Sequence, residues 1–287
     1  MVVKQKILVT GANGQLGKEL QTLSDEFAVF DFIFLTREDL AIDDAASVNT
    51  IFDKHAPQYC INCAAYTAVD KAETDRDNAF AVNGTGPGNL AAASRKYNTR
   101  FVHISTDYVF DGQATVPYPA DAPTDPQGVY GASKLAGEES AVENNDQSVI
   151  IRTSWVYSEF GKNFVKTMLR LMSEKPEISV VSDQVGSPTY AADLAKAILQ
   201  IISSGNWYPG IYHYSNAGVI SWFQFAEAIK EISGSNCVVK PIPSSAYPTP
   251  AKRPSYSAMD LSKINTKYAI EPPGWKESLK VCIGRLS

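Results

Sequence analysis

The feature that most constrains this chain is a glycine-rich turn placed directly after its first apolar run. Residues 6–10 read Lys-Ile-Leu-Val-Thr, and Gly11, Gly14 and Gly17 follow at intervals of three. An apolar strand, a glycine turn and a helix in this order begin a parallel α/β sheet. Gly11 permits the tight turn, Gly14 lets the backbone approach a pyrophosphate, and Gly17 lets the helix pack on the strand. The chain is therefore predicted to open with a dinucleotide-binding unit.

Short apolar runs alternate with helical stretches through the first half of the chain. Continuous apolar strands between amphipathic helices indicate a parallel sheet covered on both faces. We therefore expect an α/β fold, a doubly wound parallel sheet of the NAD(P)-binding Rossmann type. Strands are predicted at 7–10, 29–36, 59–64, 100–105 and 148–152, and helices at 15–24, 45–54, 75–97 and 129–143.

The second half has shorter elements and more Gly, Pro, Ser and Tyr. Helices are predicted at about 162–173, 191–203 and 221–231, and five prolines between residues 239 and 256 predict an extended loop. Such a region suits a smaller lobe that closes over a ligand. We expect an NAD(P)-binding domain over 1–158, with 191–206 returning to it, and a C-terminal substrate-binding lobe over 159–190 and 207–287.

Charge and hydropathy exclude two classes of function. The net charge is −5 and no basic cluster occurs, which argues against binding to nucleic acid. No apolar run approaches membrane-spanning length, and glycines interrupt the apolar N-terminus before it could form a signal peptide. We expect a cytoplasmic protein with no membrane partner.

Cys60 and Cys63 have the CxxC spacing of redox and zinc sites. They lie in an apolar run that predicts a buried strand, which would point the two side chains to opposite faces. No second pair and no nearby histidine completes a metal site. We therefore interpret both cysteines as core residues.

A tyrosine and a lysine one helical turn apart carry the first catalytic signal. Tyr130 and Lys134 share a face of the predicted helix 129–143. A free phenol has a pKa near 10, and a neighbouring ammonium favours the phenolate, so proton exchange with a substrate oxygen becomes feasible near neutral pH. The pair alone is a weak signal, because this spacing is common by chance.

Two hydroxyl side chains strengthen that signal. Ser105 and Thr106 end a predicted strand, and ligands bind at the carboxyl edge of a parallel sheet. A hydroxyl there can donate a hydrogen bond to a substrate carbonyl. With the glycine turn, Thr106, Tyr130 and Lys134 become candidates for a nicotinamide-dependent carbonyl reduction.

The end of the second predicted strand bears on the choice of cofactor. An acidic residue there holds the ribose 2′-hydroxyl of NAD, whereas an arginine accommodates the 2′-phosphate of NADP. Thr36 and Arg37 favour NADPH here, while Glu38 and Asp39 follow directly. Acceptance of NADH as well stays open.

Several segments together resemble the extended short-chain dehydrogenase/reductase superfamily, and within it the dTDP-4-dehydrorhamnose reductase family. The superfamily segments are 10–17 (TGANGQLG), 62–66 (NCAAY), 105–107 (STD) and 130–134 (YGASK). The narrower match adds 65–73 (AYTAVDKAE), 105–112 (STDYVFDG), 152–157 (RTSWVY), 183–189 (DQVGSPT) and Arg253-Pro254. The resemblance covers nearly the whole chain.

The resemblance implies an activity in nucleotide-sugar and polysaccharide biosynthesis. NADPH would deliver hydride to C4 of dTDP-4-dehydrorhamnose, a dTDP-sugar, and give dTDP-L-rhamnose. Thr106 would orient the C4 oxygen, Tyr130 would protonate it, and Lys134 would lower the Tyr130 pKa and hold the nicotinamide ribose. Substrate contacts would fall on Asp107, Tyr108, Trp155 and Arg253. With Arg37, the cofactor residues would be Gly11, Asn13, Gly14, Gln15, Leu16, Asp39, Leu40, Ala64, Ala65, Tyr66, Tyr130 and Lys134.

One departure from that family concerns a metal. Some members form dimers bridged by Mg²⁺ through glutamates, one of them just after the Pro-Thr motif. Residues 188–193 here read Pro-Thr-Tyr-Ala-Ala-Asp, without a glutamate, although Glu19 is present on the predicted first helix. A hard cation needs several oxygen ligands. We therefore expect no metal site, and a monomer or a weak homodimer.

Two other functions stay open at this point. Another extended short-chain reductase or epimerase acting on a nucleotide sugar would share the same three catalytic residues. A non-catalytic dinucleotide-binding regulatory subunit would share the scaffold. The intact pair of Tyr130 and Lys134 argues against the regulatory subunit, because a protein that only binds does not need the phenol.

Overall fold

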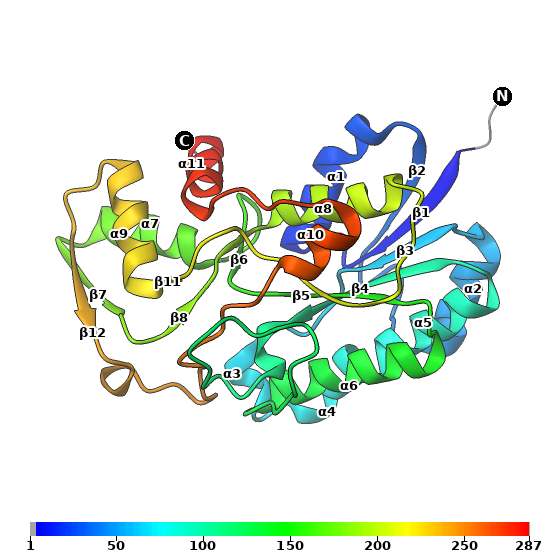
Figure 1. The fold of residues 1–287 in the computed structure, drawn as a ribbon, viewed down its shortest axis with the longest axis horizontal. Coiled ribbons are helices and arrows are strands. Elements are labelled where there is room, and N and C mark those ends of the chain that lie inside the picture. Colours follow the sequence, from blue (N-terminus) through cyan, green and yellow to red (C-terminus); the bar gives the residue numbers. More distant parts are fainter. Residues whose placement is uncertain (1–3, 287) are drawn as a thin grey trace.

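A six-stranded parallel sheet organises the computed structural model, which describes residues 4–286 (Figure 1). The strand order is β10-β5-β4-β3-β1-β2, and every neighbouring pair is parallel. The bounds are β1 Gln5–Thr10, β2 Phe30–Leu35, β3 Tyr59–Asn62, β4 Arg100–Thr106, β5 Val149–Thr153 and β10 Gly210–His213. The predicted doubly wound α/β fold is confirmed.

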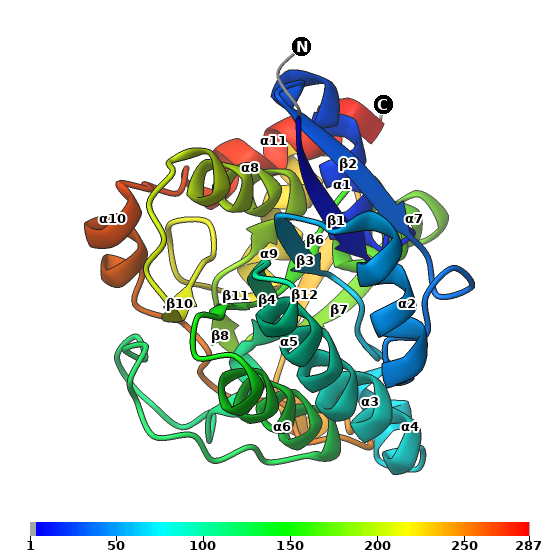
Figure 2. The same ribbon diagram turned by 90° about the vertical axis from the view of Figure 1, so that its right-hand side faces the viewer.

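Helices cover both faces of this sheet (Figures 1 and 2). One face carries α1 (Gln15–Leu23) and α8 (Ala191–Ser203), and the other carries α2 (Ala45–His55), α5 (Gly86–Lys96) and α6 (Val129–Asn144). Alternate strand residues belong to different clusters: Ile7 and Val9 pack with the α1 side, and Leu8 packs with the opposite side. This alternation explains why β1 is apolar throughout.

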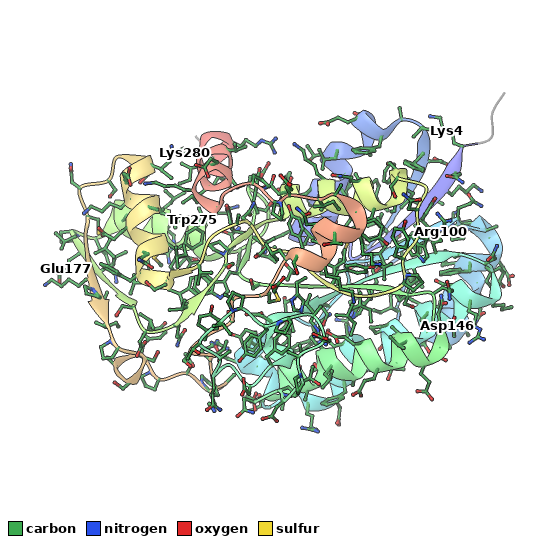
Figure 3. All side chains as sticks on the ribbon, viewed as in Figure 1. Lys4, Arg100, Asp146, Glu177, Trp275 and Lys280 are labelled. Atoms are coloured by element: carbon green, nitrogen blue, oxygen red, sulfur yellow. The ribbon has the colours of Figure 1, made fainter. Side chains whose placement is uncertain are left out.

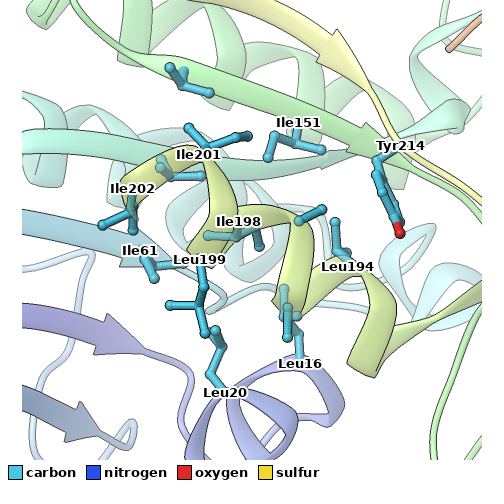
Figure 4. Close-up of a cluster of buried hydrophobic side chains, with 14 of the residues drawn as sticks. Leu16, Leu20, Ile61, Ile151, Leu194, Ile198, Leu199, Ile201, Ile202 and Tyr214 are labelled. Atoms are coloured by element: carbon cyan, nitrogen blue, oxygen red, sulfur yellow. The ribbon is translucent and has the colours of Figure 1, made fainter. Parts of the chain in front are cut away.

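The core beneath α1 and α8 combines aliphatic residues with aromatic ones such as Phe30, Tyr212 and Tyr268. Figure 4 shows Leu16 and Leu20 of α1 and Ile198 of α8 lying over Ile61 of β3 and Ile151 of β5. Leu20, Ile61, Ile151 and Ile198 are fully buried. Helix α8, although far along the chain, therefore packs into the same core as α1, β3 and β5.

The helix predicted at 75–97 is interrupted. It comprises α4 (Arg76–Phe80), a π-helical turn η2 (Ala81–Thr85) and α5. Buried Asn83 lies in that turn, and its side chain bonds both backbone groups of Tyr66 (2.8 and 3.0 Å) and the Ser133 hydroxyl (3.0 Å). The local widening directs the Asn83 amide toward the loop after β3 and toward α6, as such turns do at functional sites.

A smaller lobe has its own hydrophobic core. That core lies among α7, α9, α11 and the parallel pair β7 and β12 (Figure 1). The bounds are α7 Phe164–Glu174, α9 Trp222–Ser233, α11 Trp275–Leu286, β7 Glu177–Val181 and β12 Val238–Ile242. Two short pairs connect the lobe to the sheet: β6 (Val156–Tyr157) with β9 (Thr189–Tyr190), and β8 (Val185–Gly186) with β11 (Ile220–Ser221). The remaining elements are η1 (Ser24–Phe27), α3 (Val69–Ala72), η3 (Asp107–Val109), η4 (Ser244–Ala246) and α10 (Ser262–Tyr268).

Two expectations about the second half need correction. The prolines predicted an extended loop from residue 239, but 238–242 forms β12 despite Pro241. This strand pairs only with β7, and an edge strand tolerates the missing N–H of proline. The boundary at 207 is also too early, because β10 completes the main sheet and Ile264 and Tyr268 of α10 pack into the sheet's core.

The carboxyl ends of the main strands face the lobe. Figure 3 labels Arg100, the first residue of β4, at the end of the molecule opposite Glu177 and Trp275 of the lobe. Thr106 therefore ends β4 where the two parts of the chain meet, which is where a ligand binds in an open α/β sheet. Among residues 4–286, no helix is long and apolar enough to span a membrane.

Candidate active site

The glycine turn lies at the point where the strand order of the sheet reverses, between β1 and β3. Gly11 has a φ of +66°, and a Cβ there would lie 2.6 Å from the backbone nitrogen of Ala64. A Cβ on Gly17 would lie 2.5 Å from the carbonyl oxygen of Gly11. Both positions therefore require glycine, because α1 and the end of β3 approach the turn at backbone contact distance.

A cleft of about 730 Å³ opens at this reversal point. Except for Asp39, all the predicted cofactor residues line it: Gly11, Asn13, Gly14, Gln15, Leu16, Arg37, Leu40, Ala64, Ala65, Tyr66, Tyr130 and Lys134. Helix α1 begins after Gly14, which has no side chain to occupy the N–H groups of the first turn. Those groups are therefore available to an anionic ligand.

Asp39 has a different role from the one the resemblance implied. Its carboxylate accepts hydrogen bonds from the Thr36 backbone N–H (2.9 Å) and the Thr36 hydroxyl (2.7 Å), so it closes the turn after β2. Arg37 is exposed at the rim of the cleft and has no hydrogen bond or ion pair with any residue between 4 and 286. The turn thus leaves Arg37 as the cation at this end of the cleft.

Thr106, Tyr130 and Lys134 meet at the carboxyl end of β4. The Lys134 ammonium is buried and donates a 2.6 Å hydrogen bond to the Ile104 carbonyl of that strand. The Thr106 side chain lies beside the Tyr130 phenol, where it acts to lower the pKa of that phenol, and it donates to the Asp107 carboxylate (3.0 Å). The cleft lining includes Tyr130 and Lys134 but not Thr106.

The pKa values of this group differ from the sequence-based expectation. Burial raises the pKa of Tyr130 to about 12, against the opposing effect of the Thr106 hydrogen bond. Burial lowers the pKa of Lys134 to about 8, although the Glu138 carboxylate opposes that shift. The lowering of the Tyr130 pKa expected from Lys134 is not seen in this arrangement, because desolvation of the phenol dominates. Tyr130 is a protonated phenol at neutral pH, the form that can give a proton to a substrate oxygen.

The predicted substrate residues lie beside Tyr130 on the lobe side. The Tyr108 ring packs edge-on against the Tyr130 ring, with centroids 5.4 Å apart. Arg253 lines a small hollow with Tyr108 and donates a 2.7 Å hydrogen bond to the Asp70 carboxylate. Asp107 is buried, and burial raises its pKa to about 6. Tyr108 and Arg253 therefore line one small hollow beside Tyr130, and Asp107 is buried.

Trp155 occupies a strained position between the sheet and the lobe. Its φ is +48°, and its ring stacks on Trp222 at the start of α9, with centroids 3.5 Å apart and planes 10° apart. A Cβ on Gly186 would lie 2.9 Å from the Trp155 ring, which accounts for the glycine in the Asp-Gln-x-Gly motif. Strained backbone of this kind concentrates at ligand sites. The ring is not part of the cleft lining, so its contact with a sugar stays a prediction.

Three residues at these openings were not predicted from the sequence. Asp70 fixes Arg253, Trp222 supports Trp155, and Lys162 lines the cleft from the lobe side. Asp70 is a single charged residue whose partner Arg253 lies 183 positions away, and Lys162 is a single exposed lysine in a loop, so no local pattern marks either residue.

The two CxxC cysteines form no reactive pair. Cys60 is fully buried in β3, and burial raises its thiol pKa well above the usual value. Cys63 lines the cleft and also packs against the core beneath α1 and α8, and burial raises its pKa as well. Both thiols therefore stay protonated near neutral pH, and all four cysteines are free.

Comparison with known proteins agrees with this geometry. The family model described as RmlD substrate binding domain matches residues 5–287. This chain belongs to the RmlD family. A dTDP-4-dehydrorhamnose reductase from Aggregatibacter actinomycetemcomitans is 39% identical, over 96% of this chain and 97% of that one. The spore coat polysaccharide biosynthesis protein SpsK of Bacillus subtilis is 44% identical, over 96% and 95%. The Bacillus anthracis dTDP-4-dehydrorhamnose reductase, solved in complex with NADP, superposes with a TM-score of 0.94 at 40% identity, over 99% and 100%.

In this RmlD-family chain, Glu19 and Asp193, the acidic residues nearest to the family's metal positions, hydrogen-bond to other side chains of the protein. Glu19 is fully buried and accepts a 2.7 Å hydrogen bond from Ser158, and burial raises its pKa to about 7. The Asp193 carboxylate accepts hydrogen bonds from Asn216 and Ser278. Between residues 4 and 286, no three His, Cys, Asp or Glu side chains are grouped so that they could hold a metal ion.

We therefore expect EDTA to leave the activity and the solution mass of this RmlD-family protein unchanged. Internal hydrogen bonds already occupy Glu19 and Asp193, so neither offers the several free oxygens that a hard cation needs. The measurement is turnover and light-scattering mass before and after chelation. Loss of activity together with dissociation of a dimer, both restored by Mg²⁺, would contradict the prediction.

Proposed function

We propose that this chain is an NADPH-dependent dTDP-4-dehydrorhamnose reductase, which reduces the C4 keto group of its dTDP-sugar to give dTDP-L-rhamnose. The observation that carries the proposal is the meeting of Thr106, Tyr130 and Lys134 at the carboxyl end of β4, where Tyr130 and Lys134 line a dinucleotide-sized cleft. Full-length relatives named for this activity, at about 40% identity, support the choice of substrate.

The residues present fit a nicotinamide dinucleotide. Backbone crowding forbids a Cβ at Gly11 and Gly17, so these glycines allow the tight turn that brings the start of α1 close to the ends of β1 and β3. The open N-terminus of α1 offers N–H donors, and Arg37 offers a cation where the 2′-phosphate of NADPH would lie. The related Bacillus anthracis reductase, solved with NADP, is consistent with this assignment.

Three side chains at the carboxyl end of β4 have separate roles in carbonyl reduction. Bound NADPH supplies the hydride. The Thr106 hydroxyl orients the C4 oxygen, and Tyr130 donates its phenolic proton to that oxygen as negative charge develops there. Lys134 is fixed by the Ile104 carbonyl and places a positive charge beside the reacting groups. Since its pKa is about 12, Tyr130 begins each cycle protonated.

The remaining assignments concern substrate contacts, assembly and compartment. We assign Asp107, Tyr108, Trp155 and Arg253 to the side of the dTDP-sugar, because they adjoin Tyr130 or lie between the sheet and the lobe. We assign a monomer or weak dimer held without metal. Four free cysteines suit a reducing compartment, and we place the enzyme in the cytoplasm.

Turnover assays test the proposed function. The protein is incubated with NADPH and a panel of dTDP-4-keto sugars, and both NADPH oxidation and the product sugar are followed. Consumption with dTDP-4-dehydrorhamnose supports the proposal. Turnover of a different nucleotide sugar alone would favour another extended reductase or epimerase. Binding of NADPH without turnover of any sugar would favour a regulatory subunit.

Replacing Arg37 by alanine should weaken binding of NADPH more than binding of NADH. A hydrogen-bonded pair with a charged group contributes about 1.5–3 kcal/mol, so NADPH should lose about tenfold or more, and NADH should change little. Dissociation constants from the fluorescence of the reduced cofactors provide the measurement. Arg95→Ala, an exposed arginine on α5 outside the cleft lining, is the matched control. Equal loss for both cofactors would show that Arg37 has no role at the 2′-phosphate.

The rate of reduction should fall as the pH rises through about 8, the pKa of Lys134. Below that pH Lys134 is charged, and above it the ammonium loses the proton that supplies its positive charge. Tyr130 keeps its proton up to about pH 12, so it does not set this limit. A profile of kcat/KM from pH 6 to pH 10 tests the prediction, with Lys134→Met expected to lack the alkaline decline. A flat wild-type profile to pH 10 would argue against it.

A further inference from the structure

The loop between β6 and α7 crosses from the lobe to the first helix of the nucleotide-binding domain. Its residues Gly161 and Lys162 line the same cleft as Gln15 and Leu16 of α1. This loop belongs to the segment expected to serve only the substrate lobe. It therefore brings a charged side chain of the lobe to the N-terminal end of α1.

Hydrogen bonds from two of its residues fix this loop on α1. The Ser158 hydroxyl donates to the buried Glu19 carboxylate (2.7 Å), and the Asn163 amide donates to the Gln15 side-chain oxygen (2.9 Å). Gly161 has a φ of +65°, and a Cβ there would lie 3.1 Å from Cγ of Gln15. The backbone beside Lys162 is thus held against the first turn of α1, with little freedom to move away.

Lys162 is an exposed cation without a partner. Its ammonium makes no hydrogen bond or ion pair with any residue between 4 and 286. The acid nearest to it along the chain, Glu159, is committed to Arg285 (3.0 Å) and to the Tyr190 hydroxyl (2.9 Å). Lys162 therefore carries an uncompensated positive charge at the cleft.

The glycine turn itself supplies no cation to the cleft. Lys18, the nearest one on α1, points to Gln21 (3.3 Å) and is absent from the lining. Arg37 lies at the other end, after β2, and Lys134 is bonded to the Ile104 carbonyl. A pyrophosphate at the start of α1 would meet neutral N–H groups from the nucleotide-binding domain and one charge from the lobe.

We propose that Lys162 binds the pyrophosphate of the nicotinamide dinucleotide, so that the lobe contributes the cation which the glycine turn lacks. The inference rests on the proposed function in that it takes the ligand of the cleft to be such a dinucleotide. Pairing of the ammonium with phosphate oxygens adds charge-assisted hydrogen bonds to the N–H groups of α1. Because NADPH and NADH share the pyrophosphate, Lys162 contributes equally to both.

Titration of the reduced cofactors without any sugar tests the proposal. Lys162→Gln keeps a polar side chain that is one bond shorter and removes its charge. We expect it to weaken NADPH and NADH by the same factor, about tenfold. Lys162→Arg should restore most of the affinity, and the loss in Lys162→Gln should shrink as salt is added. Lys18→Gln, which removes a charge from α1 outside the cleft, should bind both cofactors as the wild type does.

Each result separates this inference from the proposed function. Wild-type binding of NADPH with unchanged binding by Lys162→Gln would overturn the role of Lys162 and leave the proposed function standing. A loss confined to NADPH would also overturn it, because it would place Lys162 at the 2′-phosphate. Failure of the wild type to bind either cofactor would overturn the proposed function and the inference together. Urea unfolding of each variant shows whether a change in affinity reflects lost folding.

Discussion

Tyr130→Phe should lose roughly 10²–10⁴-fold in kcat, the usual contribution of a positioned general acid. The change removes one hydroxyl and keeps the ring that packs edge-on against Tyr108. The substitution removes the proton that the proposed mechanism delivers to the C4 oxygen. The glycine turn and the N-terminus of α1 are untouched, so NADPH should bind as in the wild type. Stopped-flow or steady-state NADPH oxidation, with a separate fluorescence titration of NADPH, gives the two readouts.

Tyr118→Phe is the control for that experiment. Tyr118 is another buried tyrosine, and its hydroxyl bonds the Asp111 carboxylate and the backbone of the loop before it, outside the cleft. Its loss should leave kcat within a few-fold of the wild type. Wild-type turnover by Tyr130→Phe would remove this phenol from the mechanism. Loss of NADPH affinity equal to the loss of rate would assign Tyr130 to binding instead.

Glu138→Ala should lower the free energy of unfolding by about 3–5 kcal/mol, because it leaves a buried arginine without its counter-ion. Glu138 and Arg152 form a bidentate pair (2.9 and 2.6 Å), and both side chains are only 3% exposed. The Ser105 hydroxyl also donates to Glu138 (2.5 Å). The pair joins α6 to β5 one helical turn after Lys134. Its loss therefore destabilises the helix that carries Lys134.

Urea unfolding provides the measurement for Glu138→Ala. Glu139→Ala is the matched control, because the neighbouring glutamate is exposed on the same helix and its loss should change the free energy by less than about 0.5 kcal/mol. Equal small effects for both variants would show that Arg152 finds solvent or another acceptor when Glu138 is removed. The double variant Glu138→Ala/Arg152→Ala should recover part of the loss, since it removes the unpaired charge.

Local pattern was sufficient for the start of the nucleotide-binding domain and for the helix that carries Tyr130 and Lys134. The run after residue 6 and the glycines at 11, 14 and 17 predicted β1, its turn and α1, and the structure has them there. Strands buried on both faces carry their signal in every residue, as Ile7, Leu8 and Val9 show. The spacing of Tyr130 and Lys134 likewise placed both on one face of α6, because helical period is a local property.

The substrate side depended on contacts between distant segments. Asp70 meets Arg253 across 183 positions, and Trp155 stacks on Trp222 from another element. No window of sequence contains both partners of either pair. The same limit explains β10 and β12, whose membership of a sheet depends on which strand lies beside them, and not on their own composition.

The sequence by itself determined the parallel sheet, the glycine turn and the identity of the groups that could act on a carbonyl, since each is written in residue type and local spacing. Only the tertiary structure decided their chemical states and their partners. Burial raises the pKa of Tyr130 and so keeps its phenol protonated. In the turn after β2, the Asp39 carboxylate accepts a hydrogen bond from Thr36. The fold also carries Lys162 from the lobe to the start of α1. Desolvation and charge pairing depend on what surrounds a side chain in space, and that environment exists only after the chain has folded.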